Sequence, residues 1–287
     1  MSDRLIAAAI QMNSQADKAV NLAATERLVR EAAAGGAELV LLPEKFNLLG
    51  STKDYFAGAE PLDGETITLC AKLAEELKID LIAGSIVERI AGREKLANTC
   101  VHLAPDGKVK AAYRKIHMFD VEVEGQVYRE SDHEDPGVEI VNSQLAGGEN
   151  VGLTVCYDVR FPELYRILAL RGARIETVPA AFTYATGEAH WELLLRARAV
   201  ENQLFVVAAD QFGVHDGDRR SYGNSMIVDP WGVVLARAGD EGEAVVAAEL
   251  DFSAQAAVRD KLPSLANRMP SAYSWSESGV SGHKEIR

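Results

Sequence analysis

GGAELVLLPE, residues 35–44, combines two glycines that end a helical pattern, an apolar run, and a proline followed by an acid. The pattern returns as RGARIETVPA at residues 171–180, with the proline in the ninth place of both segments. The first segment ends on Glu44, whereas the second ends on Ala180. Each segment predicts a buried strand that follows a helix, and the fold itself does not require a carboxylate at the strand end.

The repeat extends in both directions from these segments. DLIAGSIVE (80–88) resembles QLFVVAADQ (203–211), and NTCVHLAPDGKVKAAYRK (98–115) matches GNSMIVDPWGVVLARAGD (223–240). The order strand, helix, strand, helix, strand, hairpin therefore occurs twice. This order is typical of layered α/β structures. We expect two halves, each with helices covering one face of its sheet, to pack sheet against sheet in one domain without a linker.

Four further segments complete the predicted organisation. Residues 16–36 predict a helix with Val20, Ala24 and Leu28 on its buried stripe, and residues 65–80 predict a second helix. The polar segment VEVEGQVYRESDHEDPG (121–137) predicts a long loop, which inside a compact domain is often functional. The residues after Pro270 are polar and predict an extension.

The composition excludes several kinds of partner and compartment. The 287 residues include 30 basic and 43 acidic side chains, a net charge of −13, which argues against binding to nucleic acid or anionic membranes. Three cysteines in so long a chain do not form a disulfide framework and indicate a reducing compartment. The start, MSDRLIAAAIQMN, lacks the features of a signal peptide, and no apolar run reaches the about 20 residues needed to span a bilayer. We expect a cytoplasmic protein.

Cys156 lies in ENVGLTVCYDVRFPEL (149–164), where an apolar run stops and charged residues begin. The following residues predict a helix with Pro162 in its first turn, so Cys156 lies on a strand-to-helix turn. Such a position lowers the pKa of a thiol and exposes its sulfur. The alternative is a buried apolar cysteine, which is our interpretation of Cys70 and Cys100, and position alone does not decide between the two for Cys156.

Two charged residues also stand at predicted strand ends. Glu44 follows the apolar run LVLLP, where an acid is costly unless it is solvated, paired or functional. Lys115 closes the first predicted hairpin, although an ordinary surface lysine is the alternative. His117 is a possible base for a cysteine–histidine pair. The sequence contains no CxxC, HExxH or phosphate-binding glycine motif, so it predicts no metal and no cofactor.

The segments LLPEKFN (41–47), YRKIHMFD (113–120) and VCYDVRFPEL (155–164) together resemble the nitrilase superfamily of carbon–nitrogen hydrolases. The resemblance extends from residue 6 to residue 273. It implies an α-β-β-α sandwich, with residues 1–270 as one catalytic domain and residues 271–287 as a polar extension. It also implies a homodimer or higher homo-oligomer that acts on a small-molecule amide without a cofactor.

The same resemblance implies roles for four residues. Glu44 corresponds to the general base, Lys115 to the cation on the oxyanion side, and Cys156 to the nucleophile that forms a thioester. Glu130, in YRESD, matches a second glutamate that positions the lysine and the substrate. The alternative for Glu130 is a solvated acid in a loop. A scaffold that has lost activity is the non-enzymatic alternative, and the presence of all four residue types argues against it.

Within the superfamily, CYDVRFPEL resembles the branch that contains deaminated-glutathione amidase and omega-amidase, and residues 181–203 and 221–232 look closer to the former. The implied substrate is a small carboxylated amide, most simply deaminated glutathione. Alternatives are 2-oxoglutaramate, other aliphatic amides and N-carbamoyl compounds. Lys45 after the glutamate and the acidic loop in ADQFGVHDGDRR (209–220) depart from the usual pattern and leave the substrate open.

Five residues are predicted to contact the substrate. Arg160 would meet a carboxylate, unless it forms an ion pair with Glu163 or Asp158. The backbone N–H of Tyr157 would help to bind the oxyanion. The pocket would be shaped by the side chains of the loop after Pro179, although the first of them could equally belong to the core: Phe182, Thr183 and Thr186.

Overall fold

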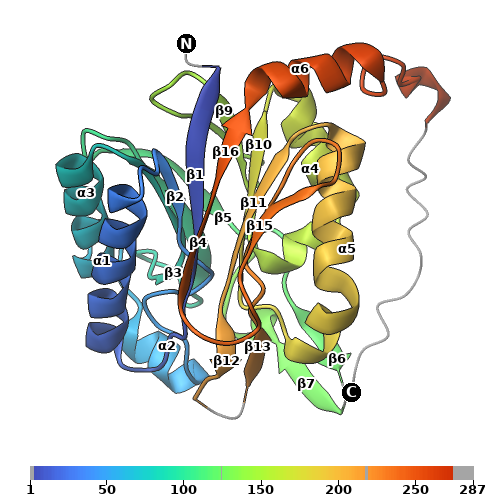
Figure 1. The fold of residues 1–287 in the computed structure, drawn as a ribbon. Helices are drawn as coiled ribbons and strands as arrows, with labels where there is room; N and C mark the ends of the chain where they lie inside the picture. The colour runs from blue at the N-terminus through green and yellow to red at the C-terminus, as the bar shows by residue number, and fades with distance from the viewer. Residues whose placement is uncertain (1–2, 124, 217–218, 274–287) are drawn as a thin grey trace.

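Two six-stranded sheets lie face to face between two layers of helices (Figure 1). The structure is a computed structural model that describes residues 3–123, 125–216 and 219–273. The first sheet has the strand order β16-β1-β2-β3-β4-β5, and the second has the order β15-β14-β11-β10-β9-β8. The predicted α-β-β-α sandwich is therefore confirmed.

The first half of the chain forms the first sheet and its outer helices. In chain order its elements are β1 (Arg4–Gln11), α1 (Lys18–Ala34), β2 (Leu39–Leu41), α2 (Thr52–Gly58), α3 (Glu65–Leu77), β3 (Asp80–Glu88), β4 (Ala97–Leu103) and β5 (Val109–Arg114).

The second half repeats this order in the second sheet. Two further strands flank the repeat in the chain: β8 precedes it and belongs to the second sheet, and β16 follows it and belongs to the first. The elements of the second half are β8 (Asn142–Gln144), β9 (Asn150–Leu153), η2 (Cys156–Arg160), α4 (Pro162–Leu170), β10 (Ile175–Ala180), α5 (Tyr184–Asn202), β11 (Phe205–Asp210), β14 (Met226–Val228), β15 (Val234–Arg237), β16 (Ala244–Asp251) and α6 (Phe252–Lys261). The strand β16 crosses back and pairs antiparallel with β1 along its whole length. The two-fold repeat read from the sequence is thus present in the structure.

The parallel strands set the position of the site. In the first sheet β1, β2 and β3 are parallel, and in the second sheet β9, β10 and β11 are parallel. Because the carboxyl ends of parallel strands meet at one edge, residues that follow β2, β9 and β10 come together there. Glu44, Cys156 and Ala181 are these residues.

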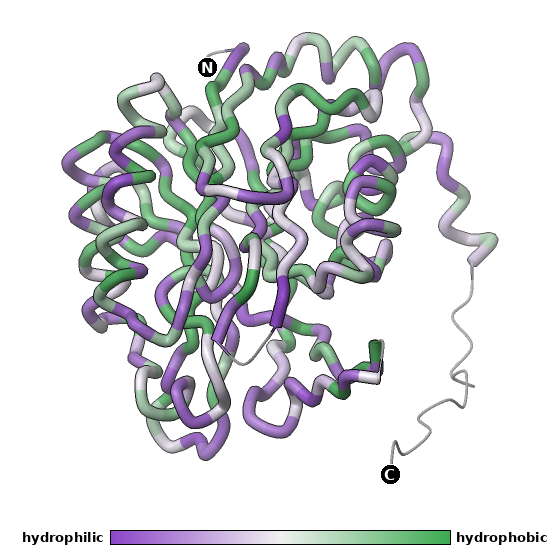
Figure 2. The backbone as a smooth tube through the Cα atoms, turned by 60° about the horizontal axis from the view of Figure 1, so that its bottom comes forward, coloured by the Kyte–Doolittle hydropathy of each residue, from purple (hydrophilic) through white to green (hydrophobic). Residues whose placement is uncertain are grey.

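Hydrophobic side chains fill the space between the sheets and beneath the helices. In Figure 2 the outer helices alternate between hydrophobic and hydrophilic residues, as expected of elements with one buried face. The predicted stripe of α1 is wrong at Val20, which is 61% exposed, whereas Leu22, Leu28 and Val29 are buried. Leu28 is buried as predicted, and the rest of the buried face lies one place beyond Val20 and Ala24, at Asn21 and Thr25, where α1 packs on the sheet and α3.

The predicted long loop at 121–137 is also wrong in its first part. Residues Asp120–Val123 and Gln126–Arg129 form an antiparallel hairpin, β6 and β7, and Glu130–Asp132 form a short 3₁₀ helix, η1. Apolar residues alternate with polar ones on β6, and Gly125 adopts a positive φ of 79° beside the turn, a pattern typical of a hairpin. The interspersed acids hid this period in the sequence.

The described part of the chain ends shortly after α6. A short 3₁₀ helix, η3 (Pro270–Ala272), follows α6, and residues 274–287 of the predicted extension lie outside the described residues. Within the described parts of the chain, none of the helices has the length and hydropathy needed to cross a lipid bilayer.

Candidate active site

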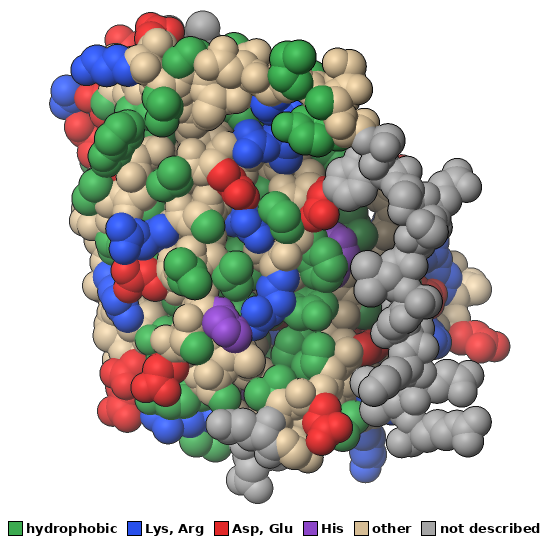
Figure 3. Space-filling model, turned by 90° about the vertical axis from the view of Figure 1, so that its right-hand side faces the viewer, with side chains coloured by type: hydrophobic (Ala, Val, Ile, Leu, Met, Phe, Trp, Pro, Cys, Tyr) green, Lys and Arg blue, Asp and Glu red, His purple; other side chains and the backbone are tan. Residues whose placement is uncertain are grey.

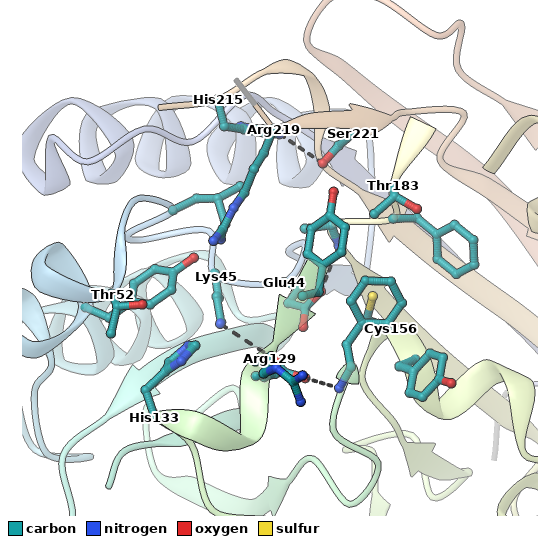
Figure 4. Close-up of a pocket in the computed structure, with 18 of the residues that line it drawn as sticks. Glu44, Lys45, Thr52, Arg129, His133, Cys156, Thr183, His215, Arg219 and Ser221 are labelled. Carbon is teal, nitrogen blue, oxygen red and sulfur yellow. Dashed lines mark hydrogen bonds and ion pairs between the residues drawn. The ribbon is translucent and has the colours of Figure 1, made fainter. Parts of the chain in front are cut away.

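A cavity of about 480 Å³ opens at the strand edge described above and contains all four predicted catalytic side chains (Figure 4). Glu44, Lys115, Glu130 and Cys156 line it together, although 112 residues separate the first from the last in the chain. The sandwich therefore brings into one pocket residues that lie on two loops and at the starts of two 3₁₀ helices.

Glu44 is held at the end of β2 by contacts with both sheets. Its side chain is only 5% exposed, and its Oε1 accepts hydrogen bonds from Asn98 Nδ2 at 2.8 Å and from Lys115 Nζ at 3.1 Å. Its Oε2 accepts a hydrogen bond from the backbone N–H of Ala181 at 2.9 Å. The buried carboxylate is thus fully partnered, which offsets the cost of its burial.

Lys115 lies between two carboxylates. Its Nζ is 3.1 Å from Glu44 Oε1 and 2.7 Å from Glu130 Oε2, and the side chain is 1% exposed. Burial opposes the charge, but Glu130 and Glu44 together hold the pKa of Lys115 well above its usual value. Burial likewise opposes the charge of Glu130, yet the cations of Lys115 and Lys45 lower its pKa. The lysine is therefore a fixed cation.

Asn98 on β4 is a site residue that the sequence reasoning missed. Its amide Nδ2 donates to Glu44 at 2.8 Å and to Glu130 at 3.3 Å, so it joins the two carboxylates that contact Lys115. Asn98 lies 54 residues from Glu44 and 32 residues from Glu130 in the chain, so only the fold shows that it contacts both.

Cys156 begins η2 with a positive φ of 49°, a conformation uncommon for residues other than glycine. This sharp turn directs the residue toward the cavity. Of the two interpretations left open for Cys156, the exposed sulfur with a lowered pKa is wrong, because Cys156 is only 8% exposed and its pKa is raised. Burial and the neighbouring Glu44 carboxylate raise the pKa, and the Lys115 cation opposes them. In the absence of a ligand, the site therefore holds a protonated thiol beside a carboxylate.

His117 does not form the alternative cysteine–histidine pair. Its Nδ1 lies 2.7 Å from Asp158 Oδ1, and its ring stacks on Phe161 with 3.5 Å between the centroids. Asp158 also accepts hydrogen bonds from Tyr113 and from the backbone N–H of Val155. These contacts give His117 a structural role in holding the turn that carries the cysteine.

Lys45, which departs from the usual family pattern, forms a buried ion pair next to the site. Its Nζ is 2.6 Å from Glu134 Oε1, 3.8 Å from Glu130 Oε1, and 4.3 Å from the centre of the Tyr55 ring. Burial raises the pKa of Glu134 in spite of this cation. Lys45 therefore extends the charged network of the site away from Cys156.

Four of the five predicted substrate contacts line the cavity: Tyr157, Phe182, Thr183 and Thr186. Phe182 is also part of the core, where it packs against Trp191, so both interpretations of this residue hold. Arg160 lies outside the lining. Its guanidinium donates to His190 Nδ1 at 3.4 Å and faces the rings of Tyr157 and Phe182, and it forms no ion pair with a described residue.

The cavity carries cations that the sequence reasoning did not select. Its lining includes five lysine and arginine side chains against three carboxylates, the reverse of the balance in the whole chain. Three of these cations were missed because they reach the pocket from a hairpin and a ribbon far away in the sequence: Arg129, Arg219 and Arg220. An excess of positive charge in a concave site favours anionic ligands.

No group of three or more histidine, cysteine, aspartate or glutamate side chains in the described parts of the chain has the geometry to hold a metal ion. The polar groups nearest Cys156 are instead paired with one another, as described above.

Residues 6–260 match the carbon–nitrogen hydrolase family. The chain is 41% identical over 269 residues to deaminated glutathione amidase from Synechocystis sp. (strain PCC 6803 / GT-S), covering 92% of this chain and 98% of that one. It is 40% identical over 267 residues to human omega-amidase NIT2, with 93% and 95% covered. The two identities are too close to distinguish the two activities.

The fold is likewise shared with a solved structure. Nit3 of Saccharomyces cerevisiae, a member of branch 10 of the nitrilase superfamily, superimposes with a TM-score of 0.84 and 32% identity, covering 92% of this chain and 96% of that one. The chain therefore belongs to the carbon–nitrogen hydrolase family of the nitrilase superfamily and is an amide-hydrolysing enzyme.

Proposed function

We propose that this enzyme hydrolyses deaminated glutathione, in which the distal carboxyl group of 2-oxoglutarate forms an amide with cysteinylglycine. The observation that supports this substrate best is the cavity, which has a volume of about 480 Å³ and an excess of lysine and arginine in its lining. Its volume falls within the range of pockets that enclose drug-sized ligands. A tripeptide-sized substrate with two carboxylates matches both the size and the charge, whereas 2-oxoglutaramate is much smaller and carries one carboxylate.

The proposed chemistry follows from the pairing of a protonated thiol with a carboxylate. Glu44 takes the thiol proton as Cys156 attacks the amide carbonyl, and Lys115 and the backbone N–H of Tyr157 bind the oxyanion. A preorganised donor of this kind contributes roughly 3 kcal/mol to the transition state. Glu44 then gives the proton to the leaving nitrogen, the C–N bond breaks, and a thioester remains on the cysteine.

Hydrolysis of the thioester completes the cycle. Glu44 accepts a proton from a water molecule as its oxygen attacks the thioester carbonyl; the C–S bond then breaks, the acid product leaves, and Glu44 returns the proton to the Cys156 thiolate. Glu130 keeps Lys115 in place through two oxygens at 2.9 and 2.7 Å, so we assign it a positioning role.

The test is release of 2-oxoglutarate from deaminated glutathione and from 2-oxoglutaramate, which give the same acid product. We expect the wild type to prefer deaminated glutathione and Cys156→Ala to lose turnover. Cys70→Ala is the matched control, since Cys70 lies on the buried face of α3 and does not line the cavity, and it should retain activity.

Each other outcome changes the proposal in a defined way. Preference for 2-oxoglutaramate would identify an omega-amidase instead. Absence of both activities would reject the proposed substrate. Aliphatic amides and N-carbamoyl compounds would then be tested as substrates. Turnover by Cys156→Ala equal to that of the wild type would reject the nucleophile.

We further propose that residues 1–270 act as one catalytic domain in a cytoplasmic homodimer. The apolar face of α4 and α5 supports self-association, since Leu170, Leu193 and Val200 on these helices are 48%, 67% and 47% exposed. Figure 3 shows hydrophobic side chains gathered on this side of the molecule. The three free cysteines are consistent with a reducing compartment.

A further inference from the structure

Arg219 lies at the tip of a small two-stranded ribbon that borders the cavity. The ribbon consists of β12 (Phe212–Val214) and β13 (Arg220–Tyr222), which pair antiparallel. The backbone N–H of His215 donates to the carbonyl oxygen of Arg219 at 2.8 Å. This hydrogen bond joins the two strands of the ribbon at Arg219, so it fixes the position of the Arg219 backbone.

The ribbon is in turn tied to the segment that follows β1. The His215 ring is buried, with Nδ1 2.8 Å from the carbonyl oxygen of Ser14 and Nε2 2.9 Å from Ser221 Oγ. The backbone N–H of Ala16 donates to Asp216 Oδ2 at 2.7 Å. Contacts on both sides of the tip therefore hold Arg219 over the cavity before any substrate binds.

The guanidinium of Arg219 enters the cavity without a carboxylate partner among the described residues. It lines the pocket, and its charge acts on Tyr55 and His133. Burial, Lys45 and Arg219 lower the pKa of His133 to about 4, so this imidazole is neutral at pH 7. A half-buried arginine that lines a cavity and forms no ion pair with a described carboxylate can bind an anion there.

The relative positions of Cys156 and Glu44 indicate which end of the substrate would reach Arg219. Figure 4 shows Lys45, His133 and Arg219 on one side of Glu44 and Cys156 on the other. In the proposed mechanism Glu44 protonates the leaving nitrogen, so the leaving portion extends past Glu44 and away from the cysteine. That path follows the wall formed by Lys45 and Tyr55, which are in contact at 4.3 Å.

We propose that Arg219 determines specificity by binding the terminal carboxylate of the leaving portion, which in deaminated glutathione is the carboxylate of its glycine. This inference rests on the proposed function and goes further by assigning one carboxylate to one residue. 2-Oxoglutaramate has no such carboxylate because its leaving group is ammonia. Arg219 would therefore separate the two substrates.

The experiment compares Arg219→Gln, Arg219→Lys and wild type on three compounds. These are deaminated glutathione, its C-terminal carboxamide, and 2-oxoglutaramate. A charged hydrogen bond of this kind corresponds to about 10- to 100-fold in kcat/KM. We expect Arg219→Gln to lose that factor on deaminated glutathione, mainly through KM, and to match wild type on the other two compounds. Arg219→Lys should recover part of the loss.

Arg220→Gln is the comparison variant, because it removes the same charge one residue along, where the guanidinium covers the Tyr184 ring at 3.8 Å. An equal loss in Arg220→Gln and Arg219→Gln would mean a general field effect and would overturn the assignment. Equal losses on all three compounds, or none, would also overturn it. Wild type inactive on deaminated glutathione would reject the proposed function, and the assignment with it.

Discussion

The pairing of Cys156 with Glu44 makes a prediction about the thiol in the absence of substrate. Burial and the Glu44 carboxylate raise the pKa of Cys156, so Glu44→Gln removes one of the two causes and leaves Lys115 in place. We expect the pKa of Cys156 to fall in Glu44→Gln, which gives more thiolate at any pH below the wild-type value. Amide hydrolysis should nevertheless fall by about 10²- to 10⁴-fold, because the base is lost.

The measurement is a pH titration of thiolate absorbance near 240 nm in wild type and Glu44→Gln, each corrected with its Cys156→Ala counterpart. The other cysteines do not interfere, since burial raises the pKa of Cys70 to about 12 and also raises that of Cys100. A higher or unchanged pKa in Glu44→Gln would contradict the proposed contact between thiol and carboxylate.

The sequence was sufficient to select four side chains that lie together in the structure, but not the protonation state of the thiol among them. Glu44, Lys115, Glu130 and Cys156 carry recognisable local patterns, and the structure brings them into one cavity. The direction of the cysteine pKa was wrong, because desolvation depends on which distant side chains cover the sulfur. Arg219 was missed for a similar reason, since only the ribbon's attachment to another loop brings it to the pocket.

At the scale of elements, Gly84 on β3 controls how closely the two sheets approach beside the site. A Cβ at this position would lie 1.6 Å from the carbonyl oxygen of Leu42 and 2.6 Å from Pro179 Cβ. Gly84→Ala must therefore displace the backbone that carries Glu44, two residues beyond Leu42. We expect a loss of about 1–3 kcal/mol in the free energy of unfolding. We also expect a fall of about 100-fold in kcat, the effect of a shift near 1 Å in a catalytic group.

Urea unfolding and initial rates on the best amide substrate would measure both effects. Gly147→Ala is the control, because a Cβ there meets no atom within 4 Å and its φ is not positive. That variant should stay within about 0.5 kcal/mol of wild type. A Gly84→Ala enzyme with wild-type stability and rate would show that the sheets can separate without moving Glu44.

Elements with a clear hydrophobic period were predicted well. The helix after Cys156 begins at Pro162, and the two hairpins β4–β5 and β14–β15 form where the repeat places them. The hairpin β6–β7 was taken for a loop because charged residues interrupt its alternation, and its pairing gives a two-stranded sheet of its own. Where the local pattern is weak, whether a segment forms a strand depends on its pairing partner, which the sequence does not identify.

At the scale of the whole molecule, the repeat predicted the two sheets but not how they are joined. The strand β16, from the end of the second half, pairs with β1 over eight residue pairs and so belongs to the first sheet. The crossing is one-way, because the second sheet contains only strands of the second half, whereas the first sheet is complete only with β16. Local pattern cannot reveal it, since β16 reads like any other strand.

The outer face of α5 leads to the last prediction, which concerns assembly. Leu193 and Val200 are seven residues apart on the helix, so they lie on one face, and they are 67% and 47% exposed. Trp231, 63% exposed, is next to Gly232, which approaches Val200 closely. An exposed apolar patch of this kind favours association, and a two-fold dimer is the commonest form.

Substitution of Leu193 by glutamate would place a charge from each copy into such an interface, and burying an unpaired charge is costly. We expect wild type to sediment with twice the 31.1 kDa mass of one chain and Leu193→Glu to shift toward the monomer at the same concentration. Val20→Glu is the matched control, since Val20 is 61% exposed on α1, on the opposite side of the sandwich (Figure 1). Dimers that survive Leu193→Glu but dissociate in Val20→Glu would place the interface on the layer of α1 and α3 instead.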